Sequence, residues 1–233
     1  TRPYHPNYTH AVFRGWYDFG GGSIADMGHY SLWPLFMTLG VDQPPVTAEA
    51  HGTTTCKIVD QVSRKHNNDV AFPYSCTVRF RFEAHNDLPA FDLYWYDGGI
   101  KPHTPDELLT SDDELPREGM MFVGDQGKIL ASFHGDRPRL LPDSKMQEVT
   151  GGQPVDEPES NRSQRVWIDA FKAGKQSPGS FILARTVTET INLWAVALRA
   201  GRRIQYDPDR LKIPNLPDAE QYFYRTYREG WEI

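Results

Sequence analysis

The sequence predicts an α+β fold, an open and mostly antiparallel sheet with helices packed on one face. A helical apolar pattern occurs once near the N-terminus, at residues 20–39. Short segments of alternating polarity then follow one another between residues 46 and 141, and two further helical patterns follow residue 160. A helix, a run of strands and then helices is the order of an α+β protein. The length of 233 residues fits one large domain or two small ones, and we expect residues 1–233 to form a single domain.

The first helix is predicted because apolar side chains recur at nearly helical spacing. These side chains are Ile24, Met27, Leu32, Leu35, Phe36 and Leu39. Three consecutive glycines precede them at residues 20–22. Such glycines are expected where another group must approach the backbone closely or where φ is positive. Gly40 is expected to end the helix, and Pro34 to kink it or break it into two pieces.

Residues 75–83 form the clearest predicted strand, because apolar and polar side chains alternate strictly. The apolar set is Cys76, Val78, Phe80 and Phe82. Residues 90–96 should pair with this strand, with Leu93 and Trp95 on one face and Tyr94 and Tyr96 on the other, and either face could be the buried one. Shorter strands are expected at residues 46–52, 56–59, 120–123, 128–133 and 137–141. Polar or proline-bearing composition predicts loops at residues 62–69, 101–116 and 147–158.

Two helices are predicted toward the C-terminus. Residues 161–173 have an amphipathic pattern, and the side chains expected to face inward are Val166, Ile168, Ala170 and Phe171. Residues 184–200 have a stronger pattern, with Gly201 as the stop. Its apolar side is Ile191, Leu193, Val196, Ala197 and Leu198. A short aromatic-rich helix is expected within residues 218–231.

Charge and cysteine usage exclude several kinds of partner. The net charge is −6 with acids and bases interspersed, which argues against nucleic acid or an anionic membrane as the main partner. We find no apolar run that predicts a bilayer span, and the compartment stays open between cytoplasm and periplasm. Cys56 and Cys76 lack the spacing of a zinc site, so no metal site is predicted, and two buried free thiols are expected.

Six residues around the first helix are candidates for a functional site. Asp26 lies three residues before His29 and four before Tyr30, so on a helix all three should share one face. Arg14, Trp16 and Tyr17 precede the glycines in a loop rich in aromatic and charged groups. The structural alternative is that Asp26 complements the helix dipole and that His29 is an ordinary core histidine.

Several motifs in order resemble those of a known family. They are FRGWYDFGGGSIADMG from residue 13, WYDGG from residue 95, FVGDQGKIL from residue 122, PRLLP from residue 138 and TYREGWE from residue 226. Together they resemble the C-terminal domain of Gfo/Idh/MocA oxidoreductases, the glucose–fructose oxidoreductase and inositol dehydrogenase family. In this family an N-terminal Rossmann domain binds NAD or NADP, and the C-terminal part contacts the substrate and forms the oligomer interface.

The resemblance implies that residues 1–233 are the substrate-binding and oligomerisation part of an NAD(P)-dependent oxidoreductase. The substrate would be a sugar, a cyclitol or a related hydroxyl or keto compound. No GxGxxG fingerprint follows a strand here, so the Rossmann half is expected to be absent from this sequence. No residue of this chain is assigned to cofactor binding, and the chain alone is expected to be inactive. A homo-oligomer formed through the free sheet face is expected.

The resemblance also assigns roles to the candidate residues. The family usually has Asp-x-x-x-His, whereas here Tyr30 occupies the histidine position and His29 comes one residue earlier. Asp26, His29 and Tyr30 are therefore the catalytic candidates, with the proton-transfer group open between His29 and Tyr30. Trp16 and Tyr17 offer flat faces for a sugar ring, and Arg14 offers a forked donor for hydroxyls.

Two other functions remain open at this point. The chain could be a non-catalytic carbohydrate-binding or oligomerisation scaffold that lacks a redox domain. It could also belong to an enzyme that uses the cofactor for elimination or hydrolysis through a transient keto intermediate.

Overall fold

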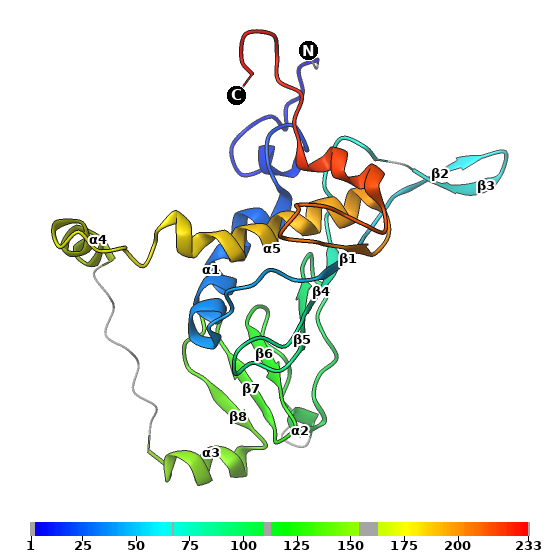
Figure 1. Cartoon of the computed structure of the whole chain (residues 1–233). Helices are drawn as coiled ribbons and strands as arrows, with labels where there is room; N and C mark the ends of the chain where they lie inside the picture. The colour runs from blue at the N-terminus through cyan, green and yellow to red at the C-terminus, as the bar shows by residue number, and fades with distance from the viewer. Residues whose placement is uncertain (1–2, 67, 110–112, 154–162, 233) are drawn as a thin grey trace. The chain divides into compact units, whose positions relative to one another are not determined.

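The computed structural model describes residues 3–66, 68–109, 113–153 and 163–232 (Figure 1). It contains open antiparallel sheets with helices packed against the main sheet, which confirms the predicted fold class. The chain divides into two compact units. Unit 1 comprises Thr1–Gly28, Asp42–Lys101 and Thr188–Ile233, and unit 2 comprises His29–Val41 and Pro102–Val187.

Unit 1 is built on a four-stranded sheet in the order β5-β4-β1-β9, and every neighbouring pair is antiparallel. The strands are β1 (Thr47–Gly52), β4 (Cys76–Phe82), β5 (Phe91–Tyr96) and β9 (Ile204–Gln205). Phe80 at the centre pairs with Ala48 on one side and with Leu93 on the other, and all three side chains are buried. Tyr94 is 51 % exposed, so the face that carries Leu93 is the core face.

Helix α5 spans Phe181–Ala200, and its residues from Thr188 onward belong to unit 1. This part of α5 covers the core face of the sheet. A Cβ added to Gly52 of β1 would lie 3.2 Å from Leu198 of α5, which shows how closely helix and strand approach. The predicted apolar side of α5 is confirmed, and Trp194 adds the largest fully buried side chain. By length and composition α5 could also cross a membrane, although a single such helix is weak evidence, and 44 % of its apolar stretch is buried within the protein.

Helix α1 (Gly22–Leu39) is one continuous helix, so the predicted break at Pro34 is wrong. Pro34 lacks the N–H that would donate to the carbonyl of Tyr30 one turn earlier. Ile24 is buried as predicted, whereas Met27 is exposed. Gly28 faces α5: an added Cβ would lie 3.1 Å from Ile191, so the start of α1 and the middle of α5 are in close contact.

A separate two-stranded hairpin belongs to unit 1, formed by β2 (Cys56–Val59) and β3 (Val62–Lys65). The predicted loop at residues 62–69 is therefore wrong over β3. All eight strand residues are exposed, so no side chain is buried and no alternation marks the strand. Cys56 is exposed and only Cys76 is buried, which corrects the expectation of two buried thiols. Near the C-terminus the short helix expected within residues 218–231 is a 3-10 helix, Pro217–Phe223.

Unit 2 contains a three-stranded antiparallel sheet of β6 (Met120–Val123), β7 (Lys128–Ala131) and β8 (Arg139–Leu141). The predicted hairpin at residues 120–133 is confirmed. A small core lies against this sheet, made by Leu108, Leu115 and Leu141 with Met121 and Leu130. Two of these leucines come from the predicted loop at residues 101–116, which contains the short helix α2 (Asp106–Leu109). Leu108 and Leu115 are buried, although the acidic composition of residues 101–116 predicted a solvent-exposed loop.

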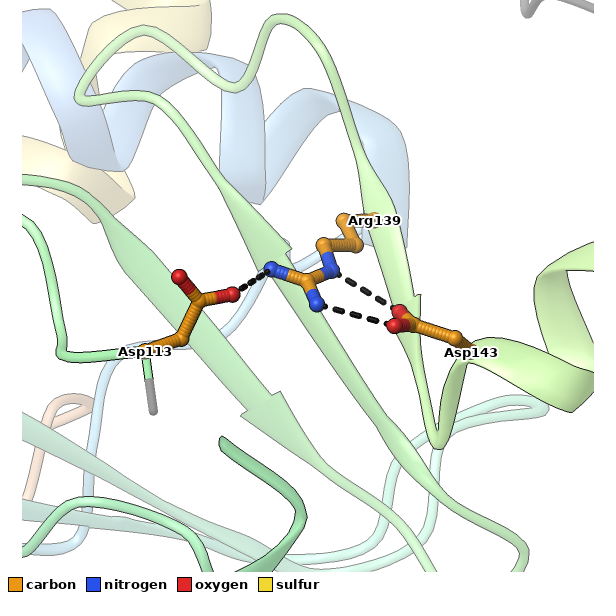
Figure 2. A network of polar contacts seen from close by, with 3 residues as sticks. All are labelled: Asp113, Arg139 and Asp143. Atoms are coloured by element: carbon orange, nitrogen blue, oxygen red, sulfur yellow. Dashed lines mark hydrogen bonds and ion pairs between the residues drawn. The ribbon is translucent and has the colours of Figure 1, made fainter. Parts of the chain in front are cut away.

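Arg139 connects β8 to α3 (Asp143–Thr150) in unit 2 (Figure 2). Its Nε and Nη2 donate to the two carboxylate oxygens of Asp143 at 2.9 and 3.0 Å, and its Nη1 donates to Asp113 at 2.8 Å. Asp143 also lies in the first turn of α3, where a carboxylate complements the helix dipole. The predicted loop at residues 147–158 is therefore wrong at its start, while residues 154–158 lie outside the described residues.

Helix α4 (Ser163–Lys172) confirms the helical prediction, while residues 161 and 162 lie outside the described part of the chain. Its predicted inward side is wrong, because Val166 and Ile168 are exposed and Phe171 is 75 % exposed. Trp167 and Phe171 stack on each other at a centroid distance of 6.0 Å.

Candidate functional site

The three-glycine loop at the start of α1 is packed against the protein's own groups. A Cβ added to Gly20 would lie 2.6 Å from the backbone of Arg14. Gly22 has φ +75°, and its added Cβ would lie 2.6 Å from the Trp194 ring and 2.8 Å from the Phe72 ring. Close approach and positive φ both explain why these positions need glycine. The groups that approach them belong to the chain itself.

Trp194 of α5 anchors this loop. Its indole Nε1 donates to the carbonyl of Gly21 at 3.1 Å, and its ring stacks on Phe72 at 5.0 Å. The Tyr17 ring lies edge-on to the Phe72 ring, at a centroid distance of 4.5 Å. Buried aromatic pairs of this kind stabilise a fold beyond the area that they bury. The loop before α1 is therefore held rigidly on α5.

Tyr17 also lies against Arg199 of α5, whose guanidinium carbon is 4.8 Å from the Tyr17 ring and 4.2 Å from the Tyr222 ring. Burial raises the pKa of Tyr17, and the positive charge of Arg199 opposes that shift. The phenol is therefore neutral at physiological pH. Arg199 joins the loop before α1 to the C-terminal 3-10 helix through two cation–π contacts.

Trp16 belongs to a different aromatic cluster from Tyr17. Its ring lies 5.1 Å from that of His5 and 4.9 Å from that of Tyr8, edge to face in both cases. Tyr8 in turn contacts Phe19 at 5.0 Å. The two predicted sugar-stacking residues thus have separate surroundings, Trp16 with the N-terminal arm and Tyr17 with α5.

Arg14 and Asp26 are brought together. The Arg14 guanidinium Nη1 donates to Asp26 Oδ2, so the short 3-10 helix Phe13–Gly15 is tied to the first turns of α1. The side chains are 45 % and 33 % exposed, which leaves the pair accessible to a ligand from solvent. The Asp26 carboxylate is therefore engaged by an arginine, which the sequence analysis did not predict.

His29 and Tyr30 lie one turn further along α1, past the boundary between the two units at Gly28. His29 is partly buried, and burial lowers the pKa of its imidazole below the usual value near 6.5. At neutral pH the imidazole is therefore uncharged and able to accept a proton. Tyr30 is 58 % exposed, and its ring lies edge-on to that of His134 at 6.2 Å.

Asp97 is a further residue of this region, which the sequence analysis contained only as part of the WYDGG motif. It follows β5 directly and accepts hydrogen bonds from Ser23, Cys76 and Trp95. The signal for it was the WYDGG motif, in which an acid is placed between aromatic residues and two glycines.

The residues of this site can be compared with metal sites and with known protein families. Within the described residues no group of three His, Cys, Asp or Glu side chains is placed to hold a metal ion. Residues 1–100 match the family model of the Gfo/Idh/MocA oxidoreductases, C-terminal alpha/beta domain. Over these 100 of the 233 residues the chain is similar to that family. The family is NAD(P)-dependent. No curated protein gives a match to the chain.

The matched residues include most of the candidate site. The Gfo/Idh/MocA match covers the three-glycine loop, the Arg14–Asp26 pair, all of α1 and the strands β1 to β5 up to Asp97. It ends where the second part of unit 1 ends, near Lys101.

Proposed function

We propose that this chain is the substrate-binding part of an NAD(P)-dependent oxidoreductase that acts on a hydroxyl or keto group of a sugar, cyclitol or related compound. The observation that carries the proposal is the family match over residues 1–100, which contain the accessible Arg14–Asp26 pair and the whole of α1. We assign the catalytic roles to Asp26, His29 and Tyr30.

The residues that the structure describes do not fit a dinucleotide cofactor. A phosphate cradle needs glycines whose missing side chains leave room for the ligand. Here the space beside Gly20 and Gly22 is filled by Arg14, Trp194 and Phe72. The strand pairs of the described residues are all antiparallel, without a parallel βαβ unit. We therefore assign the cofactor to a Rossmann domain outside this sequence and derive no step through it.

The chemistry left to this chain is binding the substrate and moving its hydroxyl proton. Oxidation of a carbinol requires a group that accepts the hydroxyl proton. His29 suits this role because burial keeps its imidazole neutral at pH 7. Tyr30 is the alternative acceptor or a hydrogen-bond donor to the same hydroxyl. The Arg14–Asp26 pair presents N–H donors and carboxylate oxygens, which can bind neighbouring hydroxyls of a polyol. Trp16 and Tyr17 would contribute ring faces or edges to the sugar.

The test is steady-state kinetics on the protein that carries this chain together with its cofactor-binding domain. Reduction of NAD⁺ or NADP⁺ is followed with a panel of aldoses, cyclitols and their acids. If His29 accepts the proton, His29→Ala lowers kcat by about a hundredfold, a typical size for loss of a general base. If Tyr30 has this role, Tyr30→Phe gives the larger loss. His51→Ala, at an exposed histidine of β1, is the matched control and should leave kcat unchanged.

The scaffold alternative makes the opposite prediction. A protein that only binds carbohydrate would reduce no nicotinamide cofactor with any member of the panel. Turnover that is unchanged in both His29→Ala and Tyr30→Phe would exclude α1 from the mechanism.

We also propose that the free face of the main sheet forms a homo-oligomer interface. This face carries an arginine–carboxylate pair, Arg79 with Asp92 at 2.9 Å, beside the exposed ring of Tyr94. Tyr94 stacks on Tyr96 at 6.3 Å, and tyrosine and arginine are enriched in protein interfaces. Sedimentation equilibrium should show an oligomer that Tyr94→Asp dissociates. A wild-type protein that stays monomeric in the micromolar range would refute this proposal.

A further inference from the structure

We propose that Asp97 is a positioning residue, which fixes the first turn of α1 to the main sheet and so sets the placement of Asp26, to which we assign a catalytic role. This inference rests on the proposed function of α1 and adds to it a residue from a different element. The contacts that support it lie within unit 1.

The carboxylate of Asp97 accepts hydrogen bonds from residues of three neighbouring segments. Its Oδ1 accepts the backbone N–H of Cys76 at 2.7 Å. Its Oδ2 accepts the indole N–H of Trp95 at 3.1 Å, the thiol of Cys76 at 3.3 Å and the hydroxyl of Ser23. Hydrogen bonds to an ionised acceptor are about twice as strong as neutral ones. One side chain thus joins β4, β5 and the first turn of α1.

The backbone around Asp97 fixes the direction of this carboxylate. The N–H of Asp97 donates to the carbonyl of Cys76 at 3.1 Å, so the two residues are joined by backbone and side-chain bonds together. Gly98 has φ +63°, and a Cβ added there would lie 2.6 Å from the carbonyl oxygen of Tyr74 and closer still to Ser75. Only glycine allows this approach. The aspartate followed by glycine in WYDGG is therefore required for the geometry.

Ser23 is the residue through which Asp97 acts on α1. It lies one residue after Gly22, at the start of the helix, and three residues before Asp26 on the same face. A carboxylate next to the N-terminus of a long helix is also favoured by the helix dipole. Asp26 lies in the same part of α1, within unit 1, so a change in the first turn alters the placement of its carboxylate. Small displacements of catalytic groups lower rates strongly.

Three substitutions separate this role from general packing. Ser23→Ala removes the helix side of the bond, and Asp97→Asn removes acceptor capacity while keeping the shape. Asp207→Asn is the matched control, since it changes another carboxylate of unit 1 that accepts backbone N–H groups, those of Asp209 and Arg210. Ser23→Thr retains a hydroxyl and should restore wild-type behaviour.

The readouts are amide hydrogen exchange of residues 24–28 and steady-state kinetics of the complete enzyme. We expect exchange in this segment to rise about tenfold in Ser23→Ala and Asp97→Asn, and kcat to fall about tenfold with little change in KM. Asp207→Asn and Ser23→Thr should match the wild type in both. If hydrogen exchange is unchanged in Ser23→Ala and Asp97→Asn, Asp97 does not anchor the first turn of α1. If exchange rises while kcat is unchanged, the anchor exists but does not position a catalytic group. If the wild-type enzyme shows no turnover, the proposed function fails, and exchange alone then decides whether Asp97 anchors α1.

Discussion

Substitution of Gly22 by alanine should destabilise unit 1 strongly, for two reasons that the structure separates. At φ +75° an L-residue with a Cβ is strained by about 1–2 kcal/mol. The new methyl would also lie 2.6 Å from the Trp194 ring and 2.8 Å from the Phe72 ring. Both rings are aromatic and stacked on each other, so overpacking adds about 1–3 kcal/mol. Gly22→Ala should therefore lower the free energy of unfolding by about 2–5 kcal/mol.

Two other glycines of unit 1 provide matched controls. Gly201 also has positive φ, at 68°, but its added Cβ meets nothing within 4 Å, so Gly201→Ala should cost only the backbone strain of about 1–2 kcal/mol. Gly15 has neither positive φ nor a neighbour within 4 Å. Gly15→Ala should be neutral or stabilise by up to about 1 kcal/mol.

Urea denaturation followed by tryptophan fluorescence gives the three free-energy changes. The order of destabilisation should be Gly22→Ala, then Gly201→Ala, then Gly15→Ala. Equal losses at Gly22 and Gly201 would show that Trp194 and Phe72 move aside at little cost, and the packing argument for the three-glycine loop would fail.

Two further predictions concern titratable groups. Cys56 is exposed, whereas Cys76 is buried, and burial together with the neighbouring Asp97 carboxylate raises the pKa of the Cys76 thiol. A thiol reagent should therefore modify Cys56 in the native protein and Cys76 only after unfolding, and peptide mapping that finds both modified in the folded state contradicts this. Burial lowers the pKa of His29, so the native state favours the neutral imidazole, and the stability that it contributes is complete above pH 6.5 and is lost as the pH falls below that value. Urea titrations between pH 5 and 8 should show this decline, and His29→Gln should flatten it; an unchanged pH dependence in the variant would assign the decline to other groups.

The elements that could be predicted from the sequence are those with a buried face. The strict alternation in β4 and the apolar side of α5 both report burial in one core, and the structure confirms both. The glycines before α1 were also correctly interpreted as a place of close approach. The sequence pattern could not tell that Trp194, from 172 positions later than Gly22, would be the approaching group, because side-chain contacts across the chain leave no local pattern.

The predictions that were wrong or missing share a physical cause. β3 buries no side chain, so its polar sequence resembled a loop. α4 has a helical apolar pattern but no described neighbour that covers Phe171, so pattern and burial disagree. Asp97 was overlooked because one acid before two glycines is typical of a turn, and its importance comes from donors on other segments. Periodicity identifies a surface that can be buried, and the partner of that surface is a property of the fold.

The β2–β3 hairpin has a consequence for how unit 1 opens. Its turn places Asp60 and Gln61 at φ 50° and 61°, a conformation that asparagine and glycine adopt more easily. A two-stranded ribbon without a buried side is only marginally stable in water. Its opening therefore costs far less free energy than opening of the four-stranded sheet, and the two events are uncoupled. This tip is accordingly the place where a protease cuts first and where an inserted peptide tag leaves the rest of unit 1 folded.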